Sequence, residues 1–146
     1  MAVSINRYDQ FPEYFGDNGI DLDGDTFKLE LYNSSHTFAQ ANNDRADISA
    51  NALATANGYT NPGQDLASVT WINSSGIITF DAADVTWNAS GGAIGPADDG
   101  VIYSDTSTVP ATDLLAYSID FDGSQTAGDG TDFKVTWDGS GIFTVS

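Results

Sequence analysis

Alternation of apolar and polar residues along the chain predicts a protein made of short β-strands. In residues 26–32, Phe27, Leu29 and Leu31 alternate with polar residues such as Glu30. Side chains at every second position of a strand point to the same face. The pattern is therefore typical of a strand that buries one face and leaves the other in water, and we expect a half-buried strand here.

Further short strands are predicted between residue 66 and the C-terminus. They are rich in β-branched and aromatic residues and are bounded by turn residues. The segments 73–76 and 138–141 are expected to be hairpin turns, because Asn and Gly accept a positive φ. Strands at this spacing predict an all-β fold, a single-domain sandwich or barrel of antiparallel strands. The expected strands are Ala67–Ile72, Gly76–Asp81, Val85–Asn88, Val101–Ser104, Leu114–Phe121, Phe133–Trp137 and Ile142–Val145.

The N-terminal segment is rich in aromatic residues. Tyr8, Phe11 and Phe15 follow helical spacing, which predicts a short helix over residues 10–15 that Asp9 caps. The aromatic side chains allow two interpretations: they complete the core of their own domain, or they dock on a neighbouring subunit.

The change of composition near residue 25 divides the chain into two parts. We expect an N-terminal arm and turn, residues 1–25, followed by a β domain, residues 26–146. Residues 33–65 are polar, and a second short helix is expected there only at 46–56.

The charge of the chain excludes several classes of partner. There are 21 acidic residues against 4 basic ones, a formal net charge of −17. Nucleic-acid binding needs clustered Lys and Arg and is therefore excluded, as is binding to anionic membrane surfaces. No long apolar run occurs, so we expect neither a signal peptide nor a membrane span. The absence of cysteine excludes disulfides and thiolate chemistry.

No motif points clearly to catalysis or to a cofactor. The turn Asp21–Asp25 offers the carboxylates that calcium prefers, but Tyr32 occupies the position where an EF-hand loop needs Glu. We interpret it as a solvated turn. His36 is the only histidine and follows Ser35, yet the G-x-S-x-G elbow of hydrolases is absent. We therefore expect no enzyme, no cofactor and no metal.

The three tryptophans, Trp71, Trp87 and Trp137, each end a Val-Thr-Trp triplet. Val and Trp share one face of a strand, so the simplest interpretation is that the tryptophans anchor the core. A row of tryptophans that stack on sugars is the alternative.

Several segments together resemble a family of small structural proteins of tailed phages. Members of this family combine an aromatic N-terminal segment with a first strand similar to residues 25–31. The resemblance spans most of the chain. The segments that carry it are residues 6–8 with Phe11 and Glu13, and residues 25–31, 46–48, 58–60, 78–87, 97–103, 136–137 and 141–144.

The resemblance implies a head decoration (cement) protein that coats the assembled capsid and braces its subunits. The implied partners are the major capsid protein and further copies of this chain, with a trimer as the expected assembly. The implied location is the outer surface of the capsid in the virion, with no enzyme activity and no cofactor. The residues expected to contact the capsid are Arg7, Tyr8, Phe11, Tyr14 and Phe15, with Arg7 pairing a capsid carboxylate.

A second hypothesis is a carbohydrate- or calcium-dependent adhesion module on a head fibre or tail. It requires one of the three tryptophans to be exposed, or Asp21–Asp25 to close on calcium. Another virion part, such as a tail component, is also compatible with the resemblance.

Overall fold

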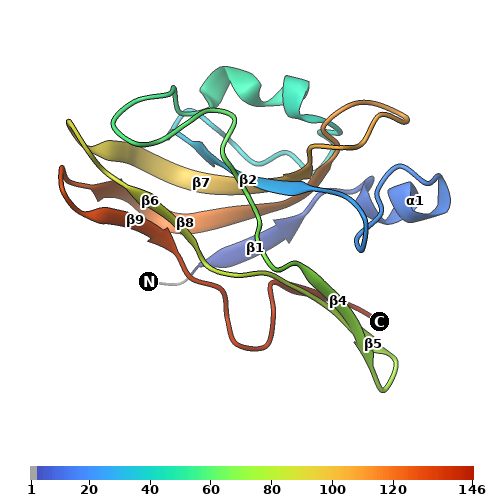
Figure 1. Ribbon diagram of the computed structural model, residues 1–146. Coiled ribbons are helices and arrows are strands. Elements are labelled where there is room, and N and C mark those ends of the chain that lie inside the picture. Colours follow the sequence, from blue (N-terminus) through green and yellow to red (C-terminus); the bar gives the residue numbers. More distant parts are fainter. Residues whose placement is uncertain (1–2) are drawn as a thin grey trace.

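The computed structural model describes residues 3–146 and shows an all-β protein (Figure 1). Within these residues the antiparallel sheets have the orders β1-β8-β7-β2-β3, β10-β5-β4 and β6-β9. The expected fold class is confirmed. The elements are β1 (Ser4–Arg7), α1 (Phe11–Gly16), β2 (Phe27–Tyr32), η1 (Arg45–Asp47), η2 (Ser49–Asn51), β3 (Gln64–Asp65), β4 (Thr70–Ser74), β5 (Ile77–Asp81), β6 (Val85–Asn88), β7 (Ile94–Ser104), β8 (Leu115–Ala127), β9 (Asp132–Val135) and β10 (Phe143–Val145).

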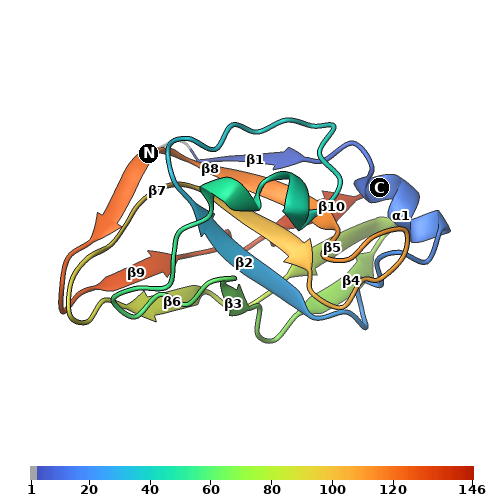
Figure 2. The same ribbon diagram turned by 90° about the horizontal axis from the view of Figure 1, so that it is seen from above.

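The sheets form two facing layers. Figure 1 and Figure 2 show the five-stranded sheet on one side and the two smaller sheets on the other. The segment 33–63, which carries η1 and η2, covers the opposite face of the five-stranded sheet. Each sheet keeps open edges, so the architecture is sandwich-like rather than a closed barrel.

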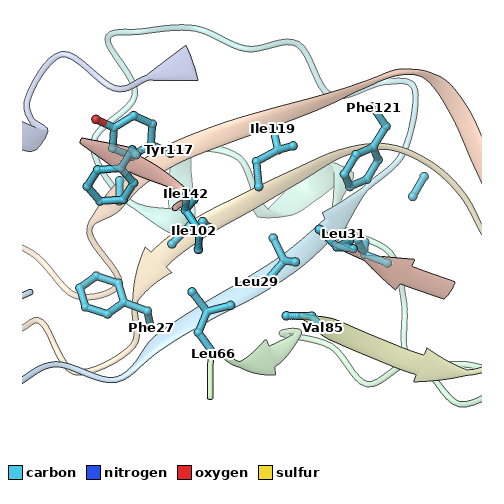
Figure 3. Packing of buried hydrophobic residues seen from close by; sticks show 14 of the residues in the cluster. Phe27, Leu29, Leu31, Leu66, Val85, Ile102, Tyr117, Ile119, Phe121 and Ile142 are labelled. Carbon is cyan, nitrogen blue, oxygen red and sulfur yellow. The ribbon is translucent and has the colours of Figure 1, made fainter. Parts of the chain in front are cut away.

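The main hydrophobic core lies between the two layers. Phe27, Leu29 and Leu31 of β2 point into it, as their alternation predicts, and are almost fully buried (Figure 3). Side chains such as Val85 and Phe80 meet them from the smaller sheets. Burial of this apolar surface, at roughly 25 cal/mol per Å², is the main force that holds the layers together.

The outer face of β2 is also largely buried, which corrects the expectation of a half-buried strand. Glu30 has no exposed surface. The segment 33–63 folds back over this face and places Ile48 against Tyr32 and Tyr103 in a second apolar cluster. The alternation of β2 therefore separates two buried environments, one apolar and one that contains polar groups.

The N-terminal segment contributes one strand to the five-stranded sheet and one helix to the main core. β1 is the outermost strand of the five-stranded sheet, with Ile5 opposite Ile119 of β8. Helix α1 places Phe11 and Tyr14 in the main core. The sheet and the core are therefore continuous across residue 25, where the sequence analysis divides the chain.

The short N-terminal helix is confirmed, with a different cap. Its N-cap is Gln10, which makes no side-chain capping bond, and a proline stands in the first turn. Asp9 does not cap the helix, since its backbone N–H donates to Gln40 O at 2.9 Å and its carboxylate accepts from Gln40 Nε2 at 3.3 Å. Asp9 thus ties the helix start to the covering segment.

Several boundaries differ from the sequence expectations. The helix expected at 46–56 is two single turns of 3-10 helix instead, η1 and η2. Strand β7 begins before its expected start and β8 ends beyond its expected end, because residues 94–100 pair with residues 119–127 in a ladder that register shifts interrupt. The 73–76 hairpin turn is confirmed, with φ of 55° at Ser75 and 87° at Gly76. The 138–141 turn instead connects β9 to β10, which belong to different sheets.

Candidate docking surface

An apolar groove opens between β1 and β8 of the large sheet and the facing layer. Its volume is about 660 Å³. Strand β9 and the segment 136–142 form its other wall. The apolar side chains that line it include Val3, Ile5, Ile119, Phe121, Phe133 and Val135.

The groove exists because the facing layer leaves the inner face of β1 partly uncovered. Ile5 lies opposite Ile119 in the sheet register, so both side chains point toward the core side. Ile119 is buried, whereas Ile5 is 41% exposed and Val3 is 51% exposed. The outer edge of β1 has no neighbouring strand within residues 3–146. An edge strand with uncovered apolar side chains is a template for pairing with another chain.

Charged side chains surround the groove. Arg7 lies opposite Tyr117 and on the same face of β1 as Ile5. Lys134 lines the groove and pairs with Asp84 at 3.1 Å. Asp138 also lines it, and hydrogen bonds from Ser140 hold the pKa of its carboxyl below the ordinary value, so it is ionised at neutral pH.

The structure separates the five predicted capsid contacts into two groups. Tyr8 packs against Phe38 in the outer cluster, with ring centroids 5.0 Å apart, and is fully buried. Phe11 packs edge-on against Tyr117 in the main core, with centroids 5.2 Å apart. Tyr14 is buried, and its hydroxyl donates to a backbone carbonyl at 3.2 Å. These three aromatic side chains are buried within the domain.

Arg7 and Phe15 are the two predicted contacts that reach the surface. Phe15 is 38% exposed and packs on Phe11 with centroids 4.9 Å apart. Phe11 in turn contacts Tyr117, which lies opposite Arg7. Arg7 and Phe15 are therefore connected through Phe11 and Tyr117, although neither of them lines the groove. We call the groove with Val3, Ile5, Arg7 and Phe15 the β1 surface.

Val3 and Ile5 were missed in the sequence analysis. Their signal is the alternation of Val3, Ile5 and Arg7 with Ser4 and Asn6, which is a strand pattern of period two. The segment is short, and the aromatic spacing that follows it favours a helix, so the strand was not assigned.

The turn at Asp21–Asp25 is organised by its own hydrogen bonds. The Asp21 carboxylate accepts from the N–H groups of Asp23 and Gly24, each at 3.1 Å, while Leu22 is buried in the core. Asp25 accepts from the Ser104 hydroxyl at 2.7 Å. Within residues 3–146, no group of three or more His, Asp or Glu side chains is placed to hold a metal ion.

The Ser35–His36 pair does not form a hydrolase-like arrangement. His36 Nδ1 lies 2.9 Å from Asp99 Oδ2, and the ring, which belongs to the covering segment, packs on Tyr32 of β2. The N–H of Ser35 donates to Asn33 Oδ1 at 2.8 Å, as in an Asx turn. His36 is buried, Asp99 is partly buried, and neither residue lines the groove beside β1.

The tryptophans pack on the core, in agreement with the core-anchor interpretation. Trp87 is buried, and Trp71 and Trp137 are partly buried against the same cluster. Trp137 also lines the groove, where its indole N–H donates to Ala83 O at 3.0 Å. It is thus the tryptophan that belongs to the β1 surface as well as to the core.

Comparison with known proteins found no relative of this chain. The chain matches no protein-family model, and searches of the curated proteins and of the solved structures found no match. No helix within residues 3–146 has the length and apolar character needed to cross a membrane.

Proposed function

We propose that this chain is a decoration protein of a tailed-phage capsid. It binds the outside of the assembled head and stabilises contacts between major capsid subunits. The observation that carries the proposal is the β1 surface, where Val3 and Ile5 stay exposed at an open sheet edge, with Arg7 on the same face of β1 as Ile5 and Phe15 exposed on α1. The resemblance of the sequence to small phage structural proteins supports the same function.

The β1 surface suits an extended segment of a capsid protein. Such a segment adds to the open edge of β1 through main-chain hydrogen bonds, and its apolar side chains enter the groove. Arg7, for which the described residues 3–146 show no ion pair, then pairs a carboxylate of the capsid.

The charge of the chain supports a place on the outside of the head. A net charge of −17 repels packaged DNA. It also keeps the unbound protein soluble before it reaches the capsid, because like-charged copies do not aggregate readily.

The first experiment is quantitative mass spectrometry of purified virions of the phage that encodes this chain. We expect abundance close to that of the major capsid protein, as a protein that covers the lattice requires. A few copies per particle would place the chain on a fibre or tail and contradict the decoration function. Complete absence from virions would also contradict it.

The second experiment tests the β1 surface directly by co-sedimentation with heads that lack the protein. We expect Ile5→Glu and Arg7→Glu to weaken binding by about tenfold or more each, or about 1.4 kcal/mol. Val109→Glu is the matched control, because Val109 is 58% exposed and does not line the groove. Circular dichroism verifies that each variant is folded, and unchanged binding of Ile5→Glu would exclude the β1 surface.

Trp137 supports one alternative function. It lines the groove together with Asp132 and Asp138. An indole ring with carboxylates beside it is an arrangement that can bind sugars, because the ring stacks on the sugar and the carboxylates accept hydrogen bonds from its hydroxyls. In that case the chain is an adhesion module, and oligosaccharides that quench the tryptophan fluorescence should lose this effect in Trp137→Phe. Without quenching by any oligosaccharide tested, this alternative fails.

A further inference from the structure

The open edge of β1 presents its main-chain groups in a fixed alternation. The N–H of Tyr8 donates to Ala116 O at 3.2 Å, which continues the antiparallel register of β1 against β8. In such a ladder every second residue directs both its N–H and its C=O toward the partner strand. The main-chain groups of Ile5 and Arg7, which alternate with Tyr8, therefore point away from β8 toward the open edge.

The free stretch of this edge ends at Arg7. The N–H of Asp9, the next donor on this side, already donates to Gln40 O of the covering segment at 2.9 Å. Among the described residues no strand pairs with the outer edge of β1. An added strand therefore pairs with Val3, Ile5 and Arg7. Antiparallel pairing, which every strand pair of this sheet uses, is the more stable arrangement per residue.

The side chains along this edge differ in chemistry. Val3 and Ile5 are exposed and line the apolar groove, so apolar side chains opposite them would leave water. Arg7 is the one basic residue of the four for which residues 3–146 show no ion pair, since each of the others pairs with a carboxylate. An acidic residue opposite Arg7 would form a charge-assisted cross-strand pair.

The other end of the edge disfavours an acidic residue. Ser4, which follows Val3, lies opposite Asp120, and the side chain of Asp120 is exposed. A carboxylate opposite Val3 would gain no cation and would add to the negative charge of Asp120. The acidic residue of a partner strand therefore belongs at the Arg7 end.

We propose that the β1 surface binds an extended segment of the capsid protein with the pattern acidic–x–apolar–x–apolar, read from its N-terminus. In the antiparallel orientation the acidic residue lies opposite Arg7, and the two apolar residues lie opposite Ile5 and Val3. This inference deepens the proposed function and rests on it, because the capsid is the expected source of the segment.

A second copy of this chain does not supply such a segment. The pattern, with side chains of valine size or larger at both apolar positions, occurs at residues 25–29, 99–103 and 113–117. These segments overlap β2, β7 and β8, each of which has a strand partner on both sides. A folded copy therefore cannot present them to the edge of β1, and the partner is a different chain.

The test is fluorescence anisotropy of a labelled synthetic peptide titrated with the full chain. In the peptide Glu, Val and Val alternate with Thr, in that order. We expect saturable binding, and Arg7→Glu should weaken it by about tenfold or more. A peptide with Lys in place of Glu should restore binding to Arg7→Glu, because the charges of the pair are exchanged. Val109→Glu adds negative charge at an exposed side chain outside the groove and should bind like the wild type.

Two N-methylated peptides test the main-chain alternation. Methylation of the Val opposite Ile5 removes an N–H that faces β1 and should abolish binding. Methylation of the Thr between the two Val residues removes an N–H that faces away and should leave binding nearly unchanged. These peptides leave the protein unaltered, so they test the proposal even if Arg7→Glu does not fold.

A peptide with the reversed sequence tests the orientation and should bind at least about tenfold more weakly. The proposal would be overturned by a wild-type chain that does not bind the alternating peptide, by equal effects of the two N-methyl groups, or by equal binding of the reversed peptide.

The proposed function is judged by different measurements. Virion abundance and co-sedimentation with heads involve no synthetic peptide, so a chain that coats heads but ignores the peptide contradicts this inference alone. A chain that binds the peptide but is absent from virions contradicts the decoration function.

Discussion

The carboxylate of Glu30 is enclosed by hydrogen-bond donors inside the protein. Arg45 donates to both of its oxygens at 2.7 Å, the Tyr32 hydroxyl donates at 2.7 Å and the Asn61 amide donates at 2.9 Å. An unpaired buried carboxylate would cost several kcal/mol, and this set of donors offsets that cost. The cluster also binds the covering segment to the sheet, since Arg45 and Asn61 come from that segment.

Removing Arg45 should destabilise the protein strongly. Arg45→Ala leaves the Glu30 carboxylate buried without its cation, and we expect the free energy of unfolding to fall by about 3–5 kcal/mol. Urea unfolding followed by fluorescence measures the change. Lys134→Ala, which removes an exposed ion pair with Asp84, is the control and should change stability little. A loss in Arg45→Ala as small as in the control would show that Glu30 is hydrated.

At the level of elements, β1 and α1 close the domain from its N-terminal end. β1 completes the five-stranded sheet, and α1 inserts Phe11 among Tyr117 and Phe143, whose rings stack on each other with centroids 4.1 Å apart. Three aromatic residues of the segment are buried. The same segment leaves the β1 surface exposed, so one stretch of chain serves both the core and the proposed docking.

Deletion of residues 2–15 should therefore unfold the domain. The deletion removes an edge strand and three buried aromatic residues, each of which contributes about 3–5 kcal/mol by comparison with large-to-alanine substitutions in other cores. Together these losses, about 9–15 kcal/mol, are comparable to the whole stability of a typical domain, about 5–15 kcal/mol. Thermal unfolding by circular dichroism should show no cooperative transition. A cooperatively folded deletion variant would instead support an arm that is separable from the β domain.

At the level of the whole molecule, the buried phenols set an upper limit on the pH range of the fold. The chain has 6 tyrosines, and burial raises the pKa of each hydroxyl above its ordinary value of 10.0. For Tyr32 and Tyr103 the carboxylate of Glu30 raises the pKa further. Folding thus favours the neutral form of the phenols, both in the main core and in the second apolar cluster.

Alkaline pH should unfold the protein in a single transition. The pKa of each folded phenol lies above the unfolded value of about 10, so this contribution to stability is complete below pH 10 and is lost as pH rises beyond it. Phenolate absorbance should stay low until circular dichroism reports unfolding, and then rise together with it. Chain unfolded in guanidinium is the control and should titrate near pH 10. Phenolate formation near pH 10 in a folded chain would contradict the burial of the tyrosines.

Neighbouring residues alone account for the local part of this structure. The period-two pattern at Phe27, Leu29 and Leu31 and the positive-φ turn at Ser75 and Gly76 depend on neighbouring residues only, and both were predicted. The all-β class follows from the same local signals. Of the proposed docking residues, Arg7 and Phe15 were predicted.

Which surfaces are buried and which strands pair depends instead on contacts between distant parts of the chain. Whether Glu30 faces water depends on Arg45 and Asn61 folding back across the sheet. Whether Tyr8 and Phe11 face a partner or the core depends on β1 pairing with β8, more than a hundred residues along the chain. The same pairing leaves Ile5 at an open edge. These outcomes follow from contacts distant in sequence, whose free energy of packing outweighs the cost of closing long loops, and no local pattern encodes them.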